Sequence, residues 1–235
     1  MSQTQTQRFT DLLANFKSGD SPLTIACFGD SVTMGYTGSG VVEQDNVYHA
    51  RLKRMLNNAY PRTVVNVINA GAAGGSAASS FSRFVRDVTH HKPDVLFIGF
   101  GLNDSGEGEA GLADFSQALT ALVNTARESG ITRIALITSN FMSTKDNPRV
   151  ATADRRHVTS MNDRQNSGLI AKYAQTVRET AAKLNIPVAD VYARWEALAK
   201  QGVDTDTLLA NGLNHPSGQA HQIHADAAFE VIMGM

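Results

Sequence analysis

Four short polar blocks carry the side chains with which this chain could perform nucleophilic chemistry. They are Gly29-Asp30-Ser31, Asn69 to Ser76, Gly101 to Asp104, and Asn211 to Pro216. Acyl transfer by a serine needs a hydroxyl on a tight turn, an imidazole that takes its proton, and donors aimed at the developing oxyanion. Ser31 and His215 could supply the first two groups. The backbone amides near Ser31 and Gly74, together with the Asn103 side chain, could supply the donors.

The elements between these blocks alternate between buried strands and helices. Apolar runs rich in β-branched residues predict strands at 23–28, 64–68, 94–100, 133–138 and 188–191. Apolar residues at three- and four-residue spacing predict helices at 48–59, 77–90, 112–128 and 162–184. Such an alternation indicates a mainly parallel sheet covered on both sides, with right-handed crossovers. The first three blocks each follow a predicted strand, at the edge of the sheet where ligands collect.

In order and spacing, the four blocks resemble those of the GDSL esterase/lipase family, the SGNH hydrolases. The matching patterns are Gly29-Asp30-Ser31, N-x-G-x-x-G from Asn69 to Gly74, G-x-N-D from Gly101 to Asp104, and His215-Pro216. The resemblance covers roughly residues 23–227 and implies one domain over 1–235. Its fold would be a three-layer α/β/α sandwich with a five-stranded parallel sheet in the flavodoxin-like order 2-1-3-4-5. The resemblance implies that Ser31 is the nucleophile and His215 the general base, with Gly74, Asn103 and the Ser31 amide as oxyanion donors.

The chain departs from the family pattern next to the histidine. The family usually has an aspartate three residues before the histidine, or four before it in relatives with an N-H-P pattern. Gly212 and Asn211 occupy these positions. An amide is neutral, but its carbonyl oxygen could orient the ring by accepting the Nδ1 hydrogen. We favour a Ser31–His215 dyad oriented by Asn211 or by a backbone carbonyl. A carboxylate such as Asp206 and a damaged active site are the two alternatives.

Composition and motifs exclude several other classes of protein. The 21 Lys and Arg residues balance 22 Asp and Glu residues, which argues against a nucleic-acid partner. The single cysteine, Cys27, excludes an intrachain disulfide framework and a cysteine-based zinc site. His221 and His224 lack an HExxH motif or a cysteine pair, so we expect no metal, and no motif implies another cofactor. A G-x-S-x-G elbow of the α/β-hydrolase type is also absent.

The remaining expectations concern location, secondary residues and substrate. Met1 to Phe9 has no apolar signal region, and no stretch approaches the roughly 18 apolar residues of a membrane span, so we expect a cytoplasmic location unless a signal was trimmed. We expect Asp30 and Asp104 to hold turns, and His221 to pack the last helix. The segment 139–160, with Arg155-Arg156-His157, is expected to be a loop that could line the pocket.

We expect a small-molecule ester as the substrate. Loops rich in Ser, Asn and Asp, without an apolar lid, favour a short acyl group on a polar carrier, such as an acetylated carbohydrate. Two alternatives remain open. One is a catalytically impaired binding domain with the SGNH fold, and the other is a lysophospholipase- or thioesterase-type acyl hydrolase.

Overall fold

The computed structural model describes residues 8–38 and 40–235. The expectation for Met1 to Phe9 therefore falls almost entirely outside the described residues.

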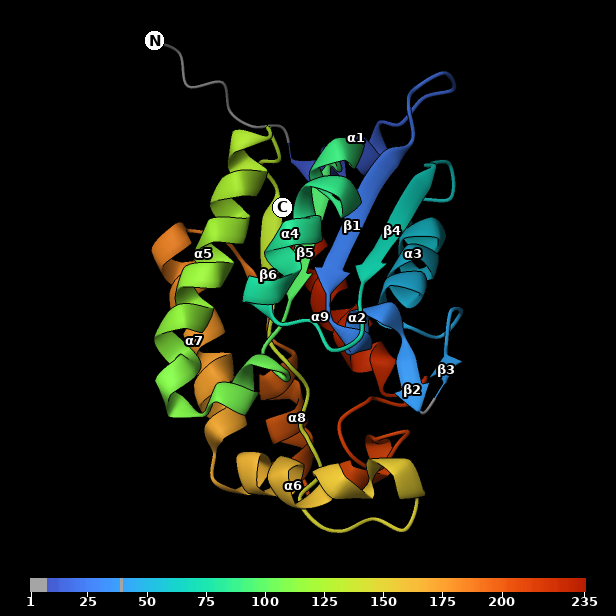
Figure 1. Ribbon diagram of the computed structural model, residues 1–235. Coiled ribbons are helices and arrows are strands. Elements are labelled where there is room, and N and C mark those ends of the chain that lie inside the picture. Colours follow the sequence, from blue (N-terminus) through green and yellow to red (C-terminus); the bar gives the residue numbers. More distant parts are fainter. Residues whose placement is uncertain (1–7, 39) are drawn as a thin grey trace.

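A five-stranded parallel sheet forms the centre of the protein (Figure 1). Its strands are β1 (Leu23–Gly29), β4 (Val65–Gly71), β5 (Val95–Gly99), β6 (Ile134–Ile137) and β7 (Val188–Ala189). They pair in the order β4-β1-β5-β6-β7, and every pairing is parallel. This confirms the predicted strand order, in which the first strand lies between the second and the third.

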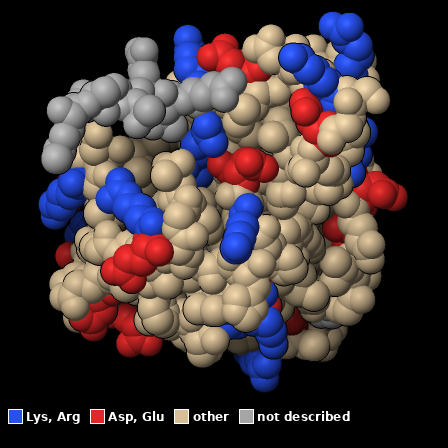
Figure 2. Space-filling view, turned by 90° about the horizontal axis from the view of Figure 1, so that it is seen from above, with Lys and Arg blue, Asp and Glu red and all other residues tan. Residues whose placement is uncertain are grey.

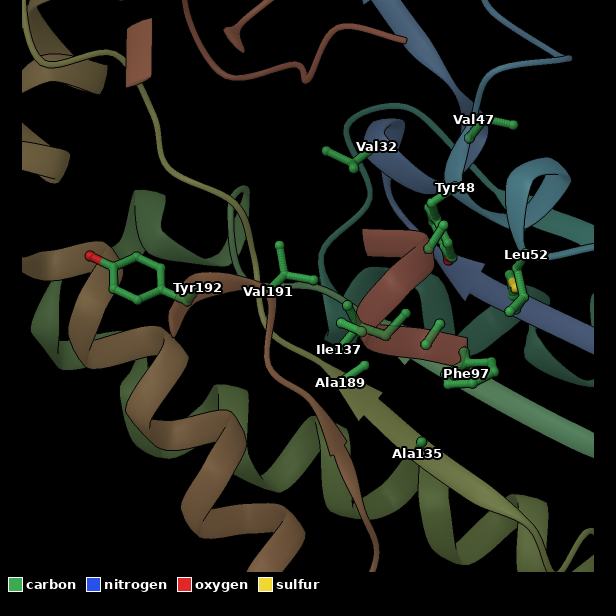
Figure 3. Close-up of a cluster of buried hydrophobic side chains, with 14 of the residues drawn as sticks. Val32, Val47, Tyr48, Leu52, Phe97, Ala135, Ile137, Ala189, Val191 and Tyr192 are labelled. Atoms are coloured by element: carbon green, nitrogen blue, oxygen red, sulfur yellow. The ribbon is translucent and has the colours of Figure 1, made fainter. Parts of the chain in front are cut away.

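Helices cover both faces of this sheet, as predicted for a three-layer sandwich. One face carries α1 (Phe9–Ala14), α3 (Tyr48–Ala59), α8 (Val191–Lys200) and α9 (His221–Gly234). The other face carries α4 (Ala77–Asp87), α5 (Leu112–Glu128) and α7 (Leu169–Leu184). Alternate strand residues serve the two layers: Ile25 and Cys27 pack toward α3 and α9, whereas Ala26 and Phe28 pack toward α4. Figure 3 shows part of the first layer, with Phe97 of β5 and Ile137 of β6 beside Tyr48 of α3.

Shorter elements extend from the ends of the sheet. They comprise α2 (Ser31–Met34), a hairpin of β2 (Tyr36–Gly38) and β3 (Val41–Val42), and α6 (Val158–Asn166). Five 3-10 turns are Thr89–His91, Asp104–Glu107, Glu109–Gly111, Thr152–His157 and Thr205–Leu208. The segment 139–160 is predicted to be a loop. It contains the Thr152–His157 turn and the first residues of α6, and α6 lies below the sheet in Figure 1.

Four predicted elements have different boundaries in the structure. Strand β4 continues through Asn69, Ala70 and Gly71, because these residues keep their register against the end of β1. The predicted helix 162–184 is two helices, since Gly168 has a φ of 78° and ends α6. Strand β7 stops after two residues, because the carboxylate of Asp190 caps α8 by accepting from Ala193 N. The predicted helix 77–90 likewise ends at Asp87, ahead of a 3-10 turn.

Glycines at the ends of β1 and β4 let α2 lie directly on the sheet. A Cβ on Gly71 would come within 2.1 Å of Met34 N, and one on Gly29 within 2.3 Å of Thr33 Oγ1. The two glycines are partners in the β1–β4 register. Asn69 Nδ2 also donates to Met34 O over 3.1 Å. The close approach of α2 therefore requires residues without side chains at both strand ends.

Charged residues of both signs are interspersed on the face at the amino ends of the strands, without a large patch of one sign (Figure 2). None of the helices among the described residues is long and apolar enough to cross a membrane.

A cluster of buried histidines packs between α3 and α9. His49, His221 and His224 are each less than 10% exposed, and the rings of His221 and His224 stack on Tyr48. His221 thus packs the start of the last helix, as expected. Burial lowers the pKa of His49 to about 4 and that of His224 to about 3, and it holds the pKa of His221 well below its ordinary value. All three imidazoles are therefore neutral in the folded protein near pH 7.

This cluster predicts that the free energy of unfolding falls as the pH drops below 6.5. In that window the unfolded chain binds protons that the folded histidines cannot, and each histidine costs about 2 kcal/mol by pH 5. The buried carboxyl of Asp30 opposes this, because burial raises its pKa to about 7 and folding is then favoured at low pH. The combined loss of unfolding free energy at the three histidines exceeds the gain at the one carboxyl. Urea titrations between pH 5 and 7 should show this loss of unfolding free energy. His224→Leu should make the dependence of the unfolding free energy on pH less steep, whereas His157→Gln, at an exposed position, should leave that dependence unchanged.

Candidate active site

Ser31 is the first residue of α2, directly after the carboxyl end of β1. Asp30 caps this short helix, since its Oδ1 accepts from Val32 N over 2.9 Å. This is the turn-holding position expected for Asp30. The Ser31 side chain is buried, and the residue is 6% exposed. A serine on a tight strand-to-helix turn matches the geometry required of a nucleophile.

His215 lies on the loop before α9 and meets Ser31 across 184 residues of sequence. Its Nε2 is 2.9 Å from Ser31 Oγ. The ring of Tyr36, from the β2–β3 hairpin, packs edge-on against the imidazole with centroids 5.0 Å apart. Burial lowers the pKa of His215 to about 4, and the charge of Asp154 acts in the opposite direction. The imidazole is neutral near pH 7, which is the protonation state a general base needs.

The segment after β6 holds the histidine loop from its other side. Asn140 Nδ2 donates to Asn214 O over 2.9 Å, and Ser143 N donates to Leu213 O over 2.6 Å. Thr144 donates to both carboxylate oxygens of Asp206, from N at 2.9 Å and from Oγ1 at 3.1 Å. Asp206 thus ties two loops together, and it is not the partner of His215 Nδ1. The alternative in which Asp206 reaches the imidazole does not fit this geometry.

Asn211 is the residue next to His215 Nδ1, but its amide has the opposite orientation to the one we expected. Its Oδ1 accepts from three backbone N–H groups, those of Leu213, Asn214 and His215, at 3.0 to 3.1 Å. Its Nδ2 is therefore directed away from them and lies 2.9 Å from His215 Nδ1. A reversed amide would place an NH2 group against three N–H donors. The amide nitrogen, and not the carbonyl, faces the imidazole.

This orientation determines which nitrogen of His215 carries the hydrogen. Because Asn211 donates to Nδ1, that atom must be an acceptor, and the hydrogen of the neutral ring is on Nε2. Nε2 then donates to Ser31 Oγ instead of accepting from it. A general base needs the other tautomer, with a free lone pair on Nε2. Asn211 thus orients His215 but stabilises the tautomer that is unsuited to deprotonating Ser31.

Asn103 and Gly74 lie on neighbouring loops at the carboxyl edge of the sheet. Asn103 follows β5, and its Nδ2 donates to Gly75 O over 3.0 Å, which joins it to the β4–α4 turn. Gly74, in that turn, has a φ of 75°. Asp104 supports both loops, because its two carboxylate oxygens accept from Ala77 N and Gly101 N. Asp104 therefore has the structural role expected for it.

Several residues that support the site gave no signal in the sequence. Arg83 donates to Ala70 O and to Gly29 O, each over 2.7 Å, and so joins the ends of β4 and β1. Arg164 donates to Leu102 O and Ser105 Oγ beside Asn103. Tyr36 and Asn140 act from segments that the sequence indicated only as connections. Each depends on contacts between residues far apart in the chain.

Cys27 and the histidine cluster offer no additional chemistry at this site. Burial raises the pKa of the Cys27 thiol to about 12, so it remains protonated. Within residues 8–38 and 40–235, no group of three or more His, Cys, Asp or Glu side chains is placed to hold a metal ion.

Fold and family together define the protein as a carboxylic ester hydrolase. The family model of the GDSL-like lipase/acylhydrolase family matches residues 27–223, and the chain belongs to this family. This confirms the resemblance found in the four sequence blocks.

Several known proteins are similar to this chain in sequence or structure. The lipase/acylhydrolase from Enterococcus faecalis superposes with a TM-score of 0.68 at 26% identity, over 90% of this chain and 96% of that one. Axe2, an acetylxylan esterase from Geobacillus stearothermophilus, has a TM-score of 0.68 at 22% identity, over 90% and 94% of the two chains. The uncharacterized lipoprotein YqeF of Bacillus subtilis is 25% identical over 201 residues, which cover 83% of this chain and 81% of YqeF.

The Asn211 geometry predicts that Asn211→Asp raises kcat for ester hydrolysis by about 10²–10⁴. A carboxylate would accept the Nδ1 hydrogen and stabilise the imidazolium that forms in the transition state. It would also raise the pKa of His215, so the acidic limb of the kcat/KM profile should move to higher pH. Rate measurements across pH on both proteins test this. Asn124→Asp, on the exposed surface of α5, is the matched control. An unchanged kcat with an unchanged acidic limb would contradict the prediction.

Proposed function

We propose that the protein hydrolyses carboxylic esters with Ser31 as the nucleophile and His215 as the general base. The contact of 2.9 Å between Ser31 Oγ and His215 Nε2 carries this proposal. As Oγ attacks the ester carbonyl, Nε2 takes its proton and then returns it to the leaving alcohol. Ser31 N–H, Gly74 N–H and Asn103 Nδ2 are the proposed donors to the oxyanion. Water resolves the acyl-enzyme by the reverse proton transfers.

Asn211 makes this reaction slower than it would be with a carboxylate. To accept a proton at Nε2, His215 must first carry its hydrogen on Nδ1, where that hydrogen meets the Asn211 amide group. The imidazolium of the transition state faces the same donor without a negative charge to stabilise it. Catalytic mutants of Axe2 replace a serine, a histidine and an aspartate. In this chain a serine, Ser31, and a histidine, His215, are paired, and Asn211 instead of an aspartate lies against the imidazole.

For the substrate we propose a short acyl group on a polar, uncharged carrier, such as an acetylated carbohydrate. A surface pocket of about 250 Å³ borders Asn103 and is lined in part by Ser76, Glu107 and Asp114. Carboxylates and hydroxyls of this kind form hydrogen bonds to sugar hydroxyls and repel anionic carriers. The acetylxylan esterase activity named for Axe2 is in line with this choice.

Two other candidate functions follow from particular observations. The orientation of Asn211 favours a binding domain with impaired catalysis, and the family name includes lipases, which act on longer acyl chains.

A cytoplasmic location stays a prediction, because the relative YqeF is named as a lipoprotein.

Replacing the nucleophile tests the enzyme mechanism. Ser31→Ala should abolish both turnover of p-nitrophenyl acetate and labelling by a fluorophosphonate probe, because the Ser31 hydroxyl is the group paired with His215. Ser82→Ala, on the exposed surface of α4, should retain both signals. Wild-type protein that neither turns over the ester nor reacts with the probe would favour the binding domain.

Acyl-chain preference tests the substrate class. In a series of p-nitrophenyl esters, kcat/KM for the acetate should exceed that for the octanoate by about tenfold or more, on the scale of a few methylenes in a pocket. Carrier recognition can be checked with an acetylated xylo-oligosaccharide. Glu107→Gln should raise the KM for this substrate, and it should leave the kcat for the p-nitrophenyl ester unchanged. A preference for octanoate would instead favour the lipase or lysophospholipase alternative.

A further inference from the structure

Asn211 is followed by Gly212, and this is the single Asn-Gly dipeptide in the chain. We propose that Asn211 is a site of spontaneous deamidation, and that its conversion to aspartate supplies the carboxylate that His215 lacks. The modification stands on the geometry of the loop alone. Its effect on activity rests on the proposed function of the Ser31–His215 pair.

The reaction needs only water as a co-reactant. The backbone nitrogen of Gly212 loses its proton and attacks Cγ of Asn211, the C–N bond of the side-chain amide breaks, and ammonia leaves. The resulting five-membered succinimide is opened by water at one of its two carbonyls, giving either aspartate or isoaspartate. The sum is the replacement of an amide by a carboxyl group, with no change of oxidation state. Gly212 has no Cβ beside the attacking nitrogen, and the Asn147 side chain packs where a Cβ would lie.

The loop supports this reaction at two atoms. Three backbone N–H groups already point at Asn211 Oδ1, at 3.0 to 3.1 Å, and would stabilise the negative charge that develops there when Cγ is attacked. The attacking group, Gly212 N, is held only by a long hydrogen bond of 3.3 Å to Leu209 O. Asn211 itself is partly exposed, so water can reach the imide.

Conversion to aspartate would reverse the hydrogen bond at His215. The oxygen held by three N–H groups would keep its bonds, and the new oxygen would stand where Nδ2 lies 2.9 Å from Nδ1. Asn214, whose Oδ1 accepts from Nδ2 over 3.1 Å, would turn its amide so that its own NH2 group donates to the new oxygen. A carboxylate only accepts, so the imidazole would carry its hydrogen on Nδ1 and leave Nε2 free for the Ser31 proton. Isoaspartate adds a carbon to the main chain between Asn211 and Gly212, and would break the backbone bonds of the turn. Only the aspartate product is therefore expected to gain activity.

Ageing the purified protein at mildly alkaline pH tests the proposal. Peptide mapping by mass spectrometry should show conversion at Asn211 ahead of every other asparagine. Esterase activity should rise with the aspartate fraction by about tenfold or more, toward the value of Asn211→Asp. Asn211→Gln is the matched control, because its cyclisation needs a less favoured six-membered ring. The mass of the peptide that contains residue 211, and the esterase activity of this variant, should stay constant in time.

The outcomes separate the modification from the proposed function. Asn211 that stays intact while other asparagines convert would overturn the modification. Conversion to aspartate without a rise in activity, although Asn211→Asp is faster than the fresh protein, would overturn the activation. If Asn211→Asp is no faster than the fresh protein, the activation is overturned together with the proposed role of His215, while the conversion measured by mass still stands.

Discussion

The close approach of α2 to the ends of β1 and β4 is the constraint on which the site depends. Ser31 begins this helix, and the helix backbone occupies the space that a side chain at Gly29 or Gly71 would need. Arg83 fastens the same two strand ends through their carbonyl groups. The position of the hydroxyl is therefore set by the sheet, whose interior is close-packed and rigid. A loop arriving 184 residues later can meet it at hydrogen-bond distance.

Burial of the site also changes its electrostatics. His215 lies in a region from which water is largely excluded, and its pKa falls to about 4 for that reason. The imidazole is consequently neutral over most of the physiological range, and the imidazolium of the proposed mechanism is costly to form there. A charge placed at Nδ1 would have a large effect in this environment, because electrostatic interactions are weakly screened. The identity of residue 211 matters more here than it would on the surface.

Asparagine and aspartate have nearly the same shape, and the N–H groups around residue 211 can hold one oxygen of either side chain. The Asn211 amide nitrogen also donates to Asn214 Oδ1 over 3.1 Å, a bond that an aspartate would replace only if the Asn214 amide turned. Three backbone N–H groups fix one oxygen of the side chain, which leaves the second terminal atom facing His215. An NH2 group at that point donates a hydrogen, whereas a carboxylate oxygen accepts one. Loop conformation and ring orientation can therefore be retained while the proton on the imidazole changes place. At this site, the terminal atom of residue 211 that faces Nδ1 therefore decides whether His215 adopts the tautomer suited to a general base.

Apolar spacing in the sequence by itself indicated the strands and the two helical layers, because such spacing is a local property. The order of the strands and the meeting of four polar blocks at one edge followed from the resemblance of short motifs to a known family. The sequence did not determine where β4 ends, since Asn69 to Gly71 remain in the strand through pairing with β1. It also left open what orients His215. Only the tertiary structure showed that Asp206 is occupied by Thr144 and that the Asn211 amide nitrogen faces Nδ1. Those outcomes depend on which donors converge on an oxygen in space, and a residue pattern does not contain that information.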